Sequence, residues 1–290
     1  MRGYSSGKPT DILISVTVHN EDFDLKTFLV KLDFNEKSIQ ELARYLCTQG
    51  NKENEFSFLF AKVLDDFLSY AHPDFYTVLQ YNEKAMEESD EEIKIRSSES
   101  YGYSKVGLGL YSDIAIINSK DDVTDIIEFK TNRHSAYVYH YINSNSQDLS
   151  KILKNKFWDY TFSDVSKLLK KKKHFPNIRF WCGTLLYSLE RKTESPKKYG
   201  RYLADDRAQR LSDSQPRDLN DLDTECQKKC DAFASALIKI KDMIPDTNPS
   251  RKGECIKIDL KEEDFIHKII ARGIHRDILV RSDLILFEVK

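Results

Sequence analysis

The sequence has no long hydrophobic run, and no apolar segment approaches the roughly 20 residues that a membrane-spanning helix needs. The first residues, M-R-G-Y-S-S-G-K-P-T, contain no apolar stretch of the kind that secretory signal peptides carry. We therefore expect an intracellular, cytoplasmic protein that does not associate with a membrane.

Paired cysteines and a strong net charge are also lacking. Five cysteines are an odd number in a chain of 290 residues, which predicts reduced thiols rather than a disulfide framework. A net charge of −2 excludes a polycation, so any nucleic-acid-binding surface has to be local. No helix-turn-helix or zinc-finger pattern points to base readout. The 40% of hydrophobic and 32% of charged residues are typical of a globular protein with a sizeable core.

The most informative stretch that is present runs from residue 107 to residue 132. It contains two apolar runs, Leu110–Ile117 and Val123–Phe129, joined by a polar tip, which is typical of a β-hairpin. Burying an unpaired charge is costly, so charged residues inside such strands indicate a site. The charged residues Asp113, Glu128 and Lys130 interrupt or follow these runs.

The register of the hairpin decides whether these charges meet. Glu128 and Lys130 project to the same face of their strand because strand side chains alternate. With a four-residue loop, Asn118 pairs with Val123 and Asp113 falls opposite Glu128. A five-residue loop would place the two acids on opposite faces. In the first register, two carboxylates and an ammonium converge, which favours a Mg²⁺ site with Mn²⁺ as a substitute.

Asp113, followed after fourteen residues by Glu128-Phe129-Lys130, resembles the active-site signature of the PD-(D/E)xK nuclease superfamily. This group includes restriction endonucleases and many repair and defence nucleases. Ser112 stands where the name-giving proline of the family would be. The resemblance implies that Asp113 and Glu128 hold the metal, that the Phe129 carbonyl adds a ligand, and that Lys130 acts on the attacking water.

The activity that the resemblance implies is metal-dependent hydrolysis of phosphodiester bonds, with DNA favoured over RNA and an endonuclease over an exonuclease. Restriction or another form of anti-phage defence would be the biological setting, and a homodimer is compatible with it. One alternative is a nuclease-like module that binds nucleic acid or protein without cleavage. Another is a metal-free protein in which the three charges form a buried ion cluster.

A further metal ligand is suggested by Glu55, in the first turn of an amphipathic helix over residues 55–70. Many members of the superfamily carry an acidic residue on the helix before the sheet. The other interpretation is a glutamate that complements the helix dipole. Gln147 lies where some branches of the family carry a glutamine.

Basic residues cluster after the hairpin. Between Lys151 and Arg179 there are nine Lys or Arg residues against two Asp residues. Clustered cations are the electrostatic signature of nucleic-acid binding, although cations also favour helix C-termini for structural reasons. The candidate nucleic-acid-binding residues are Arg133, His134, Lys170, Lys171, Lys172 and Lys173.

Three other patterns imitate sites. Asp74 follows a proline, but at a strand entrance where Pro-Asp is common turn chemistry. Asp283 and Glu288 repeat the S-D…E-x-K pattern with only four residues between them, and they would face opposite sides of one strand, predicted at a sheet edge. Cys226 and Cys230 lie at i, i+4 on a helix without a nearby Cys/His pair in sequence, which favours core packing.

The predicted fold class is α/β, with a central mixed β-sheet flanked by helices. Residues 1–50 form an N-terminal extension, 51–190 a restriction-endonuclease-like core, and 191–290 additional α/β elements packed on it. Strands are expected over residues 11–18, Phe75–Tyr81, Ile178–Leu189, Cys255–Leu260 and Asp277–Val289. The remaining helices are expected over Ser38–Cys47, Gln147–Tyr160, Ser163–Lys173, Glu225–Met243 and Phe265–Arg272.

Overall fold

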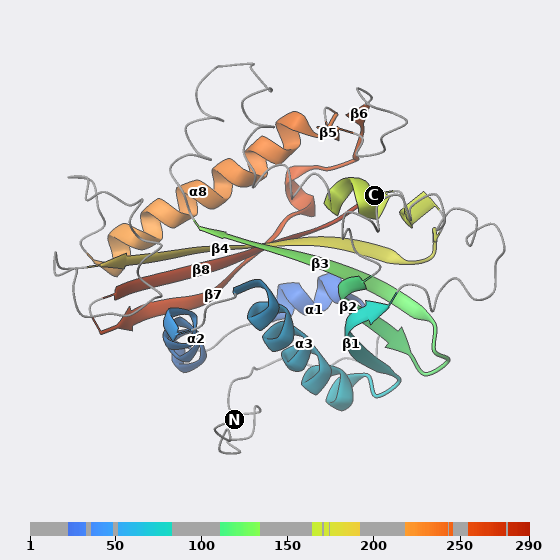
Figure 1. The fold of residues 1–290 in the computed structure, drawn as a ribbon, viewed down its shortest axis with the longest axis horizontal. Helices are drawn as coiled ribbons and strands as arrows, with labels where there is room; N and C mark the ends of the chain where they lie inside the picture. The colour runs from blue at the N-terminus through green and yellow to red at the C-terminus, as the bar shows by residue number, and fades with distance from the viewer. Residues whose placement is uncertain are drawn as a thin grey trace.

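The computed structural model describes residues 23–32, 36–48, 52–82, 111–133, 164–169, 171–173, 175–191, 218–242, 244–245, 255–276 and 278–290 (Figure 1). Its long helices are α1 (Leu25–Lys31), α2 (Glu36–Thr48), α3 (Lys52–Ala71) and α8 (Leu219–Ile240), and residues 164–169 and 171–173 are also helical. The strands are β1 (Phe75–Asn82), β2 (Tyr111–Asn118), β3 (Val123–Arg133), β4 (Arg179–Arg191), β5 (Ile244–Pro245), β6 (Cys255–Ile256), β7 (Ile266–His275) and β8 (Ile278–Glu288). A short 3-10 turn, η5 (Glu262–Asp264), precedes β7.

Six of these strands form one mixed sheet in the order β1-β2-β3-β4-β8-β7. The first three strands are antiparallel neighbours, β3 and β4 are parallel, and β8 is antiparallel to both β4 and β7. A parallel pair requires a crossover connection, and the chain between β3 and β4 contains the helical segment 164–169. The predicted α/β class with a mixed sheet flanked by helices is therefore confirmed.

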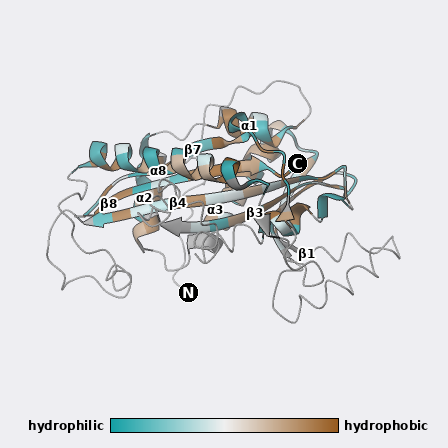
Figure 2. Ribbon diagram, turned by 90° about the horizontal axis from the view of Figure 1, so that it is seen from above, coloured by the Kyte–Doolittle hydropathy of each residue, from teal (hydrophilic) through white to brown (hydrophobic). Residues whose placement is uncertain are grey.

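Helices cover both faces of this sheet (Figure 1). On one face, α8 and the segment 164–169 bury a cluster that includes Ala115, Ile126 and Phe180. On the other face, α1 and α3 pack on residues that include Ile127 and Phe129. The helices carry hydrophobic and hydrophilic residues side by side, as helices with one buried face do (Figure 2). We call the first surface the α8 face and the second the α3 face.

The C-terminal strands correct two predictions. The predicted helix over Phe265–Arg272 is wrong, because this segment forms β7 and pairs with β8 from Ile266↔Leu286 to His275↔Ile278. Its apolar residues fit a helical period, but the backbone of β8 offers a hydrogen-bonding edge that decides the outcome. The predicted edge position of the last strand is also wrong, because β8 lies between β4 and β7.

Most other predicted elements have close counterparts, among them α2, α3, β1 and β4. The helix predicted from Glu225 begins earlier, at Leu219, because the Asp218 side chain caps the Asn220 and Asp221 amides. The strand predicted over Cys255–Leu260 is limited to β6. The expected strand at 11–18 and the helix Gln147–Tyr160 lie outside the described residues. Among the described helices, none is long and apolar enough to cross a membrane.

A partly buried ion network joins the first helix to the sheet. Arg179 Nη2 lies 2.8 Å from Asp125 Oδ2, and Arg179 Nη1 lies 2.6 Å from Asp24 Oδ1. Trp181 Nε1 donates to the second Asp125 oxygen at 2.9 Å. Asp125 is fully buried, and burial raises the pKa of its carboxyl while Arg179 opposes that rise. Asp125 lies inside the run predicted as apolar, and its role was not predicted.

Gly183 on β4 leaves room for the ring of Phe129, its partner in β3. A Cβ at Gly183 would lie 2.5 Å from two ring atoms of Phe129 and 2.9 Å from Leu286 Cδ1, which is closer than real contacts allow. Phe129 is itself wedged between Phe56 and Phe60, with ring centroids 5.1 and 5.3 Å away. The ring therefore has little room to move aside.

The Gly183→Ala variant is accordingly expected to lose about 1–3 kcal/mol of unfolding free energy through overpacking. Urea unfolding measures this loss. Gly273→Ala is the matched control, because a Cβ there would meet Ala43 at an ordinary 3.5 Å. Equal midpoints for the two variants would contradict the packing described for Phe129.

Candidate active site on the β2–β3 hairpin

The three predicted catalytic residues lie on one face of the sheet. In β3, Ile127 and Phe129 point to the α3 face, so Glu128 and Lys130 point to the α8 face. In β2, Ala115 and Ile117 belong to the α8 face, and Asp113 shares their parity. The hairpin thus presents Asp113, Glu128 and Lys130 together.

The register agrees with the prediction at the site but not at the turn. Ile114 pairs with Ile127 and Ile116 with Asp125, which places Asp113 opposite Glu128. At the turn, however, Ile117 pairs with Val123, whereas the prediction paired Asn118 with Val123. A bulge that leaves one extra residue in β3 restores the register. The extra residue is Thr124, whose hydroxyl donates to the Ile116 carbonyl at 3.2 Å.

The carboxylate of Asp113 and the ammonium of Lys130 both contact the backbone of Phe129. The Phe129 amide donates to Asp113 Oδ2 at 2.7 Å, and Lys130 Nζ donates to the Phe129 carbonyl at 3.0 Å. Asp113 and Glu128 are buried, and the side chain of Lys130 is 21% exposed. These contacts hold the charged groups beside the carbonyl that the resemblance assigns to the metal.

Two residues that were not predicted complete the cluster. The helical segment 164–169 packs on the α8 face and brings Asp164 and Lys167 to the hairpin. Lys167 Nζ donates to Glu128 Oε1, and Lys130 Nζ lies 3.1 Å from Asp164 Oδ2. In the sequence, the i, i+3 spacing of Asp164 and Lys167 around Val165 was the pattern that could have predicted their place. In a helix this spacing puts both side chains on the side of Val165, which is buried against the sheet.

Among the described residues of the cluster, acidic groups outnumber basic ones. The carboxyls of Asp113, Glu128 and Asp164 outnumber the ammonium groups of Lys130 and Lys167. Burial is the main cause that raises the pKa of Asp164 to about 6; Lys130 lowers this pKa and the charge of Glu128 raises it. Asp164 can therefore exchange a proton close to neutral pH, as general acids and bases do.

Strand β4 adds two buried polar side chains to the same face. Cys182 pairs with Glu128 and Thr184 with Lys130 across the parallel strands. Burial holds the pKa of the Cys182 thiol well above its usual range, so the thiol stays protonated. Within the described part of the chain, Thr184 Oγ1 is buried without a hydrogen-bond partner. A polar atom of this kind marks a place where water or a ligand would be stabilised.

No protein-family model matches the chain, and no curated protein or solved structure shows significant similarity to it. Its site is therefore interpreted from its own geometry.

The side-chain and backbone atoms on the hairpin are of the chemical type that binds a hard cation. They include the Asp113 and Glu128 carboxylates and the Phe129 carbonyl, with the Asp164 carboxyl nearby, all oxygen ligands of the type that Mg²⁺ prefers. These carboxylates do not lie within 4.8 Å of one another. Among the described residues, one group of three Cys, His, Asp or Glu side chains is that close, and it lies outside the hairpin. The ammonium of Lys167 instead contacts Glu128.

Several predicted site residues, or their side chains, lie outside the described residues. Glu55 lies in the first turn of α3, a helix that packs on the opposite face, and its side chain is outside the described residues. Arg133 ends β3 with its backbone paired to Tyr187, but its side chain is likewise outside the description. His134, Gln147 and Lys170 lie outside the described residues.

The lysine run has a partly structural role. Lys172 Nζ donates to the Ile178 carbonyl at 2.8 Å, and the Lys171 carbonyl accepts from the Phe175 amide at 2.9 Å. Lys173 is exposed. Of the described lysines in this run, Lys173 is therefore the one best placed to meet a phosphate backbone.

Of the two imitations of the signature, the one in the last strand shows the predicted alternation of faces but not the predicted edge position. Asp74 is exposed in the turn before β1. In β8, Asp283 faces the α8 side with Ile285 and Phe287, whereas the parity of Glu288 places it on the other face. Asp283 is bound by Arg281 through two hydrogen bonds, of 2.7 and 2.9 Å.

Proposed function

We propose that this protein is a metal-dependent nuclease that hydrolyses phosphodiester bonds, with DNA as the favoured substrate and endonucleolytic cleavage as the favoured mode. The observation that carries the proposal is the convergence of Asp113, Glu128 and Lys130 on one face of adjacent strands. Restriction or anti-phage defence inside the cell is the setting that we propose for it.

The order of elements supports a restriction-endonuclease-like core. Helix α3, strands β1, β2 and β3, the helical segment 164–169 and strand β4 follow one another in the α-β-β-β-α-β order that the resemblance implies. The charged residues occupy β2, β3 and the following helix, on the face that this helix covers. The C-terminal strands β8 and β7 extend the same sheet.

Each residue has a role that follows from its contacts. Asp113 and Glu128, with the Phe129 carbonyl, would hold the divalent cation, which when bound supplies charge neutralisation and a more acidic water. Lys130, held by Asp164 and the Phe129 carbonyl, would stabilise the negative charge that grows on the phosphate oxygens. Asp164 would take up or release a proton near neutral pH.

A cleavage assay tests the proposal directly. The full chain is incubated with plasmid, linear duplex DNA, single-stranded DNA and RNA, each with Mg²⁺, Mn²⁺ or EDTA. We expect cleavage of DNA with either cation and none with EDTA. A failure to cleave any of the four substrates with both cations would overturn the proposed activity.

The ion pair between Lys167 and Glu128 favours a second candidate, a face that binds nucleic acid without cleaving it. An ammonium can neutralise Glu128 in place of a metal. The Lys167→Met variant separates the two candidates. If a cation competes with Lys167, this variant binds Mg²⁺ more tightly and its melting temperature rises more with Mg²⁺ than that of the unmodified protein. If the face is metal-free, Mg²⁺ changes neither melting temperature.

A further inference from the structure

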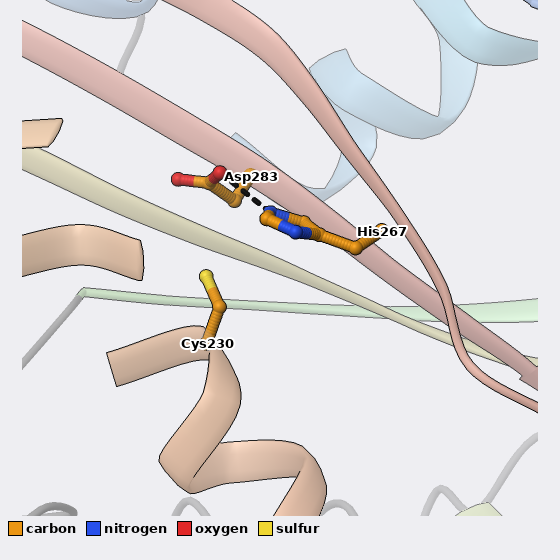
Figure 3. Close-up of side chains that lie close together, drawn as sticks. All are labelled: Cys230, His267 and Asp283. Carbon is orange, nitrogen blue, oxygen red and sulfur yellow. Dashed lines mark hydrogen bonds and ion pairs between the residues drawn. The ribbon is translucent and has the colours of Figure 1, made fainter. Parts of the chain in front are cut away.

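A second polar group lies on the α8 face, formed by Cys230 of α8, His267 of β7 and Asp283 of β8. One donor atom from each residue lies within 4.8 Å of the other two, and His267 Nε2 is 2.8 Å from Asp283 Oδ1. The thiol of Cys230 points from its helix toward the two strand residues (Figure 3). This is a mixed sulfur, nitrogen and oxygen set from three separate elements.

The fold brings together residues that are far apart in sequence. His267 pairs with Ile285, two residues from Asp283, so both side chains share one face of the β7–β8 pair. Helix α8 lies across this face and buries Cys226, Cys230 and Phe233 against it. Core packing was predicted for Cys226 and Cys230 because no second Cys/His pair lies near them in sequence.

The carboxylate of Asp283 is already oriented by a buried arginine. Arg281 donates to both Asp283 oxygens, and its Nη1 lies 2.6 Å from Asp223 Oδ1. Metal-ligating carboxylates are commonly held in this way by neighbouring hydrogen bonds. The side chain of His267 is 29% exposed, whereas those of Asp283 and Arg281 are almost wholly buried. His267 therefore marks the side from which a small ion would enter.

We propose that Cys230, His267 and Asp283 form a binding site for Zn²⁺ or a chemically similar divalent cation, separate from the hairpin site. Thiolate, imidazole and carboxylate are the three ligand types that Zn²⁺ accepts, whereas Mg²⁺ and Ca²⁺ prefer oxygen ligands alone. Three protein ligands leave a fourth position for water or a substrate group. The site would tie α8 to the β7–β8 pair.

Binding exchanges protons for the ion. The Cys230 thiol loses its proton to solvent. The proton in the hydrogen bond between His267 Nε2 and Asp283 moves to the other ring nitrogen or to solvent, and both residues then bond to the cation. Affinity should therefore increase with pH, because the ion competes with protons for its ligands.

Cobalt and zinc titrations of the full chain test the site. Co²⁺ bound to a thiolate gives a sulfur-to-metal charge-transfer absorption, which we expect with one equivalent of Co²⁺ and which Zn²⁺ should displace. Mg²⁺ in large excess should not displace it. The absence of this absorption in the unmodified protein would overturn the proposal without any variant.

Variants then assign the ligands. Cys230→Ser and His267→Ala are each expected to weaken Zn²⁺ binding at least about tenfold and to remove the rise in melting temperature that Zn²⁺ produces. Cys255→Ser is the matched control, since this thiol is exposed and distant in sequence, and it should bind Zn²⁺ normally. Glu128→Gln should also bind Zn²⁺ normally. Failure of the zinc proposal can therefore be distinguished from failure of the proposed nuclease activity. Equal binding by Cys230→Ser and Cys255→Ser would contradict the assignment.

Discussion

The Glu128→Gln variant is expected to lose at least about a hundredfold of metal-dependent DNA cleavage while keeping its fold. Glutamine preserves the volume of Glu128 and can still accept the hydrogen bond from Lys167, but it removes the charge that would bind the cation. Removing one positioned catalytic group commonly costs this much or more. Initial rates on plasmid with Mg²⁺ measure the loss.

The same loss is expected for Asp113→Asn and Lys130→Met, which remove the other two charges of the hairpin. Glu263→Gln is the matched control, because this glutamate is exposed in η5, and it should cleave at the unmodified rate. Loss of cleavage in hairpin variants prepared in the same way as this active control also excludes a contaminating nuclease. Full activity in all three hairpin variants would disprove the assigned site even if the protein itself cleaves DNA.

The Arg179→Met variant is expected to lose about 3–5 kcal/mol of unfolding free energy, because it leaves the carboxylate of Asp125 buried without its cation. Denaturant unfolding at neutral pH measures this loss. The double variant Arg179→Met/Asp125→Asn should recover part of it, since the buried charge is then removed. Lys62→Met is the matched control, as its i, i+4 ion pair with Asp66 on α3 is partly exposed and contributes about 0–1 kcal/mol.

The loss in Arg179→Met should also depend on pH. Without Arg179, burial raises the pKa of the Asp125 carboxyl further above that of the unfolded chain. A group with a raised folded-state pKa favours the folded state below its unfolded pKa and loses that contribution as pH rises through the folded value. The difference in stability between the variant and the unmodified protein should thus shrink as pH falls. A difference that is constant with pH would show that Asp125 is not the source.

Local patterns predicted most of the sheet because strands and helices leave different periodicities. The runs that became β1, β2, β3 and β4 are short, apolar and bounded by turn residues, and α3 follows a helical apolar pattern. The segment that became β7 was predicted wrongly, because the spacing of its apolar residues fits either a helix or a strand. Pairing with β8 decides for the strand. The two strands join through a two-residue connection in which Arg276 has a φ of 58°, and its dipeptide, Arg-Asp, is not one of the glycine-containing pairs that predict such a turn.

The candidate site was also predicted only in part from local patterns. Alternation along β3 placed Glu128 and Lys130 together, but the turn depended on a bulge at Thr124 that the residue count did not reveal. Asp164 and Lys167 were visible only as parts of a basic helix. Their contacts with the hairpin depend on how the crossover segment crosses the α8 face.

The sequence by itself determined the α/β class, the hairpin, and the charges of Asp113, Glu128 and Lys130 on it, because each depends on residues close together in the chain. Only the tertiary structure decided which cations neutralise Glu128 and Asp125, where β8 lies in the sheet, and that Cys230 meets His267 and Asp283. These are contacts between distant segments. Their geometry depends on strand order and helix packing, which side-chain periodicity does not encode.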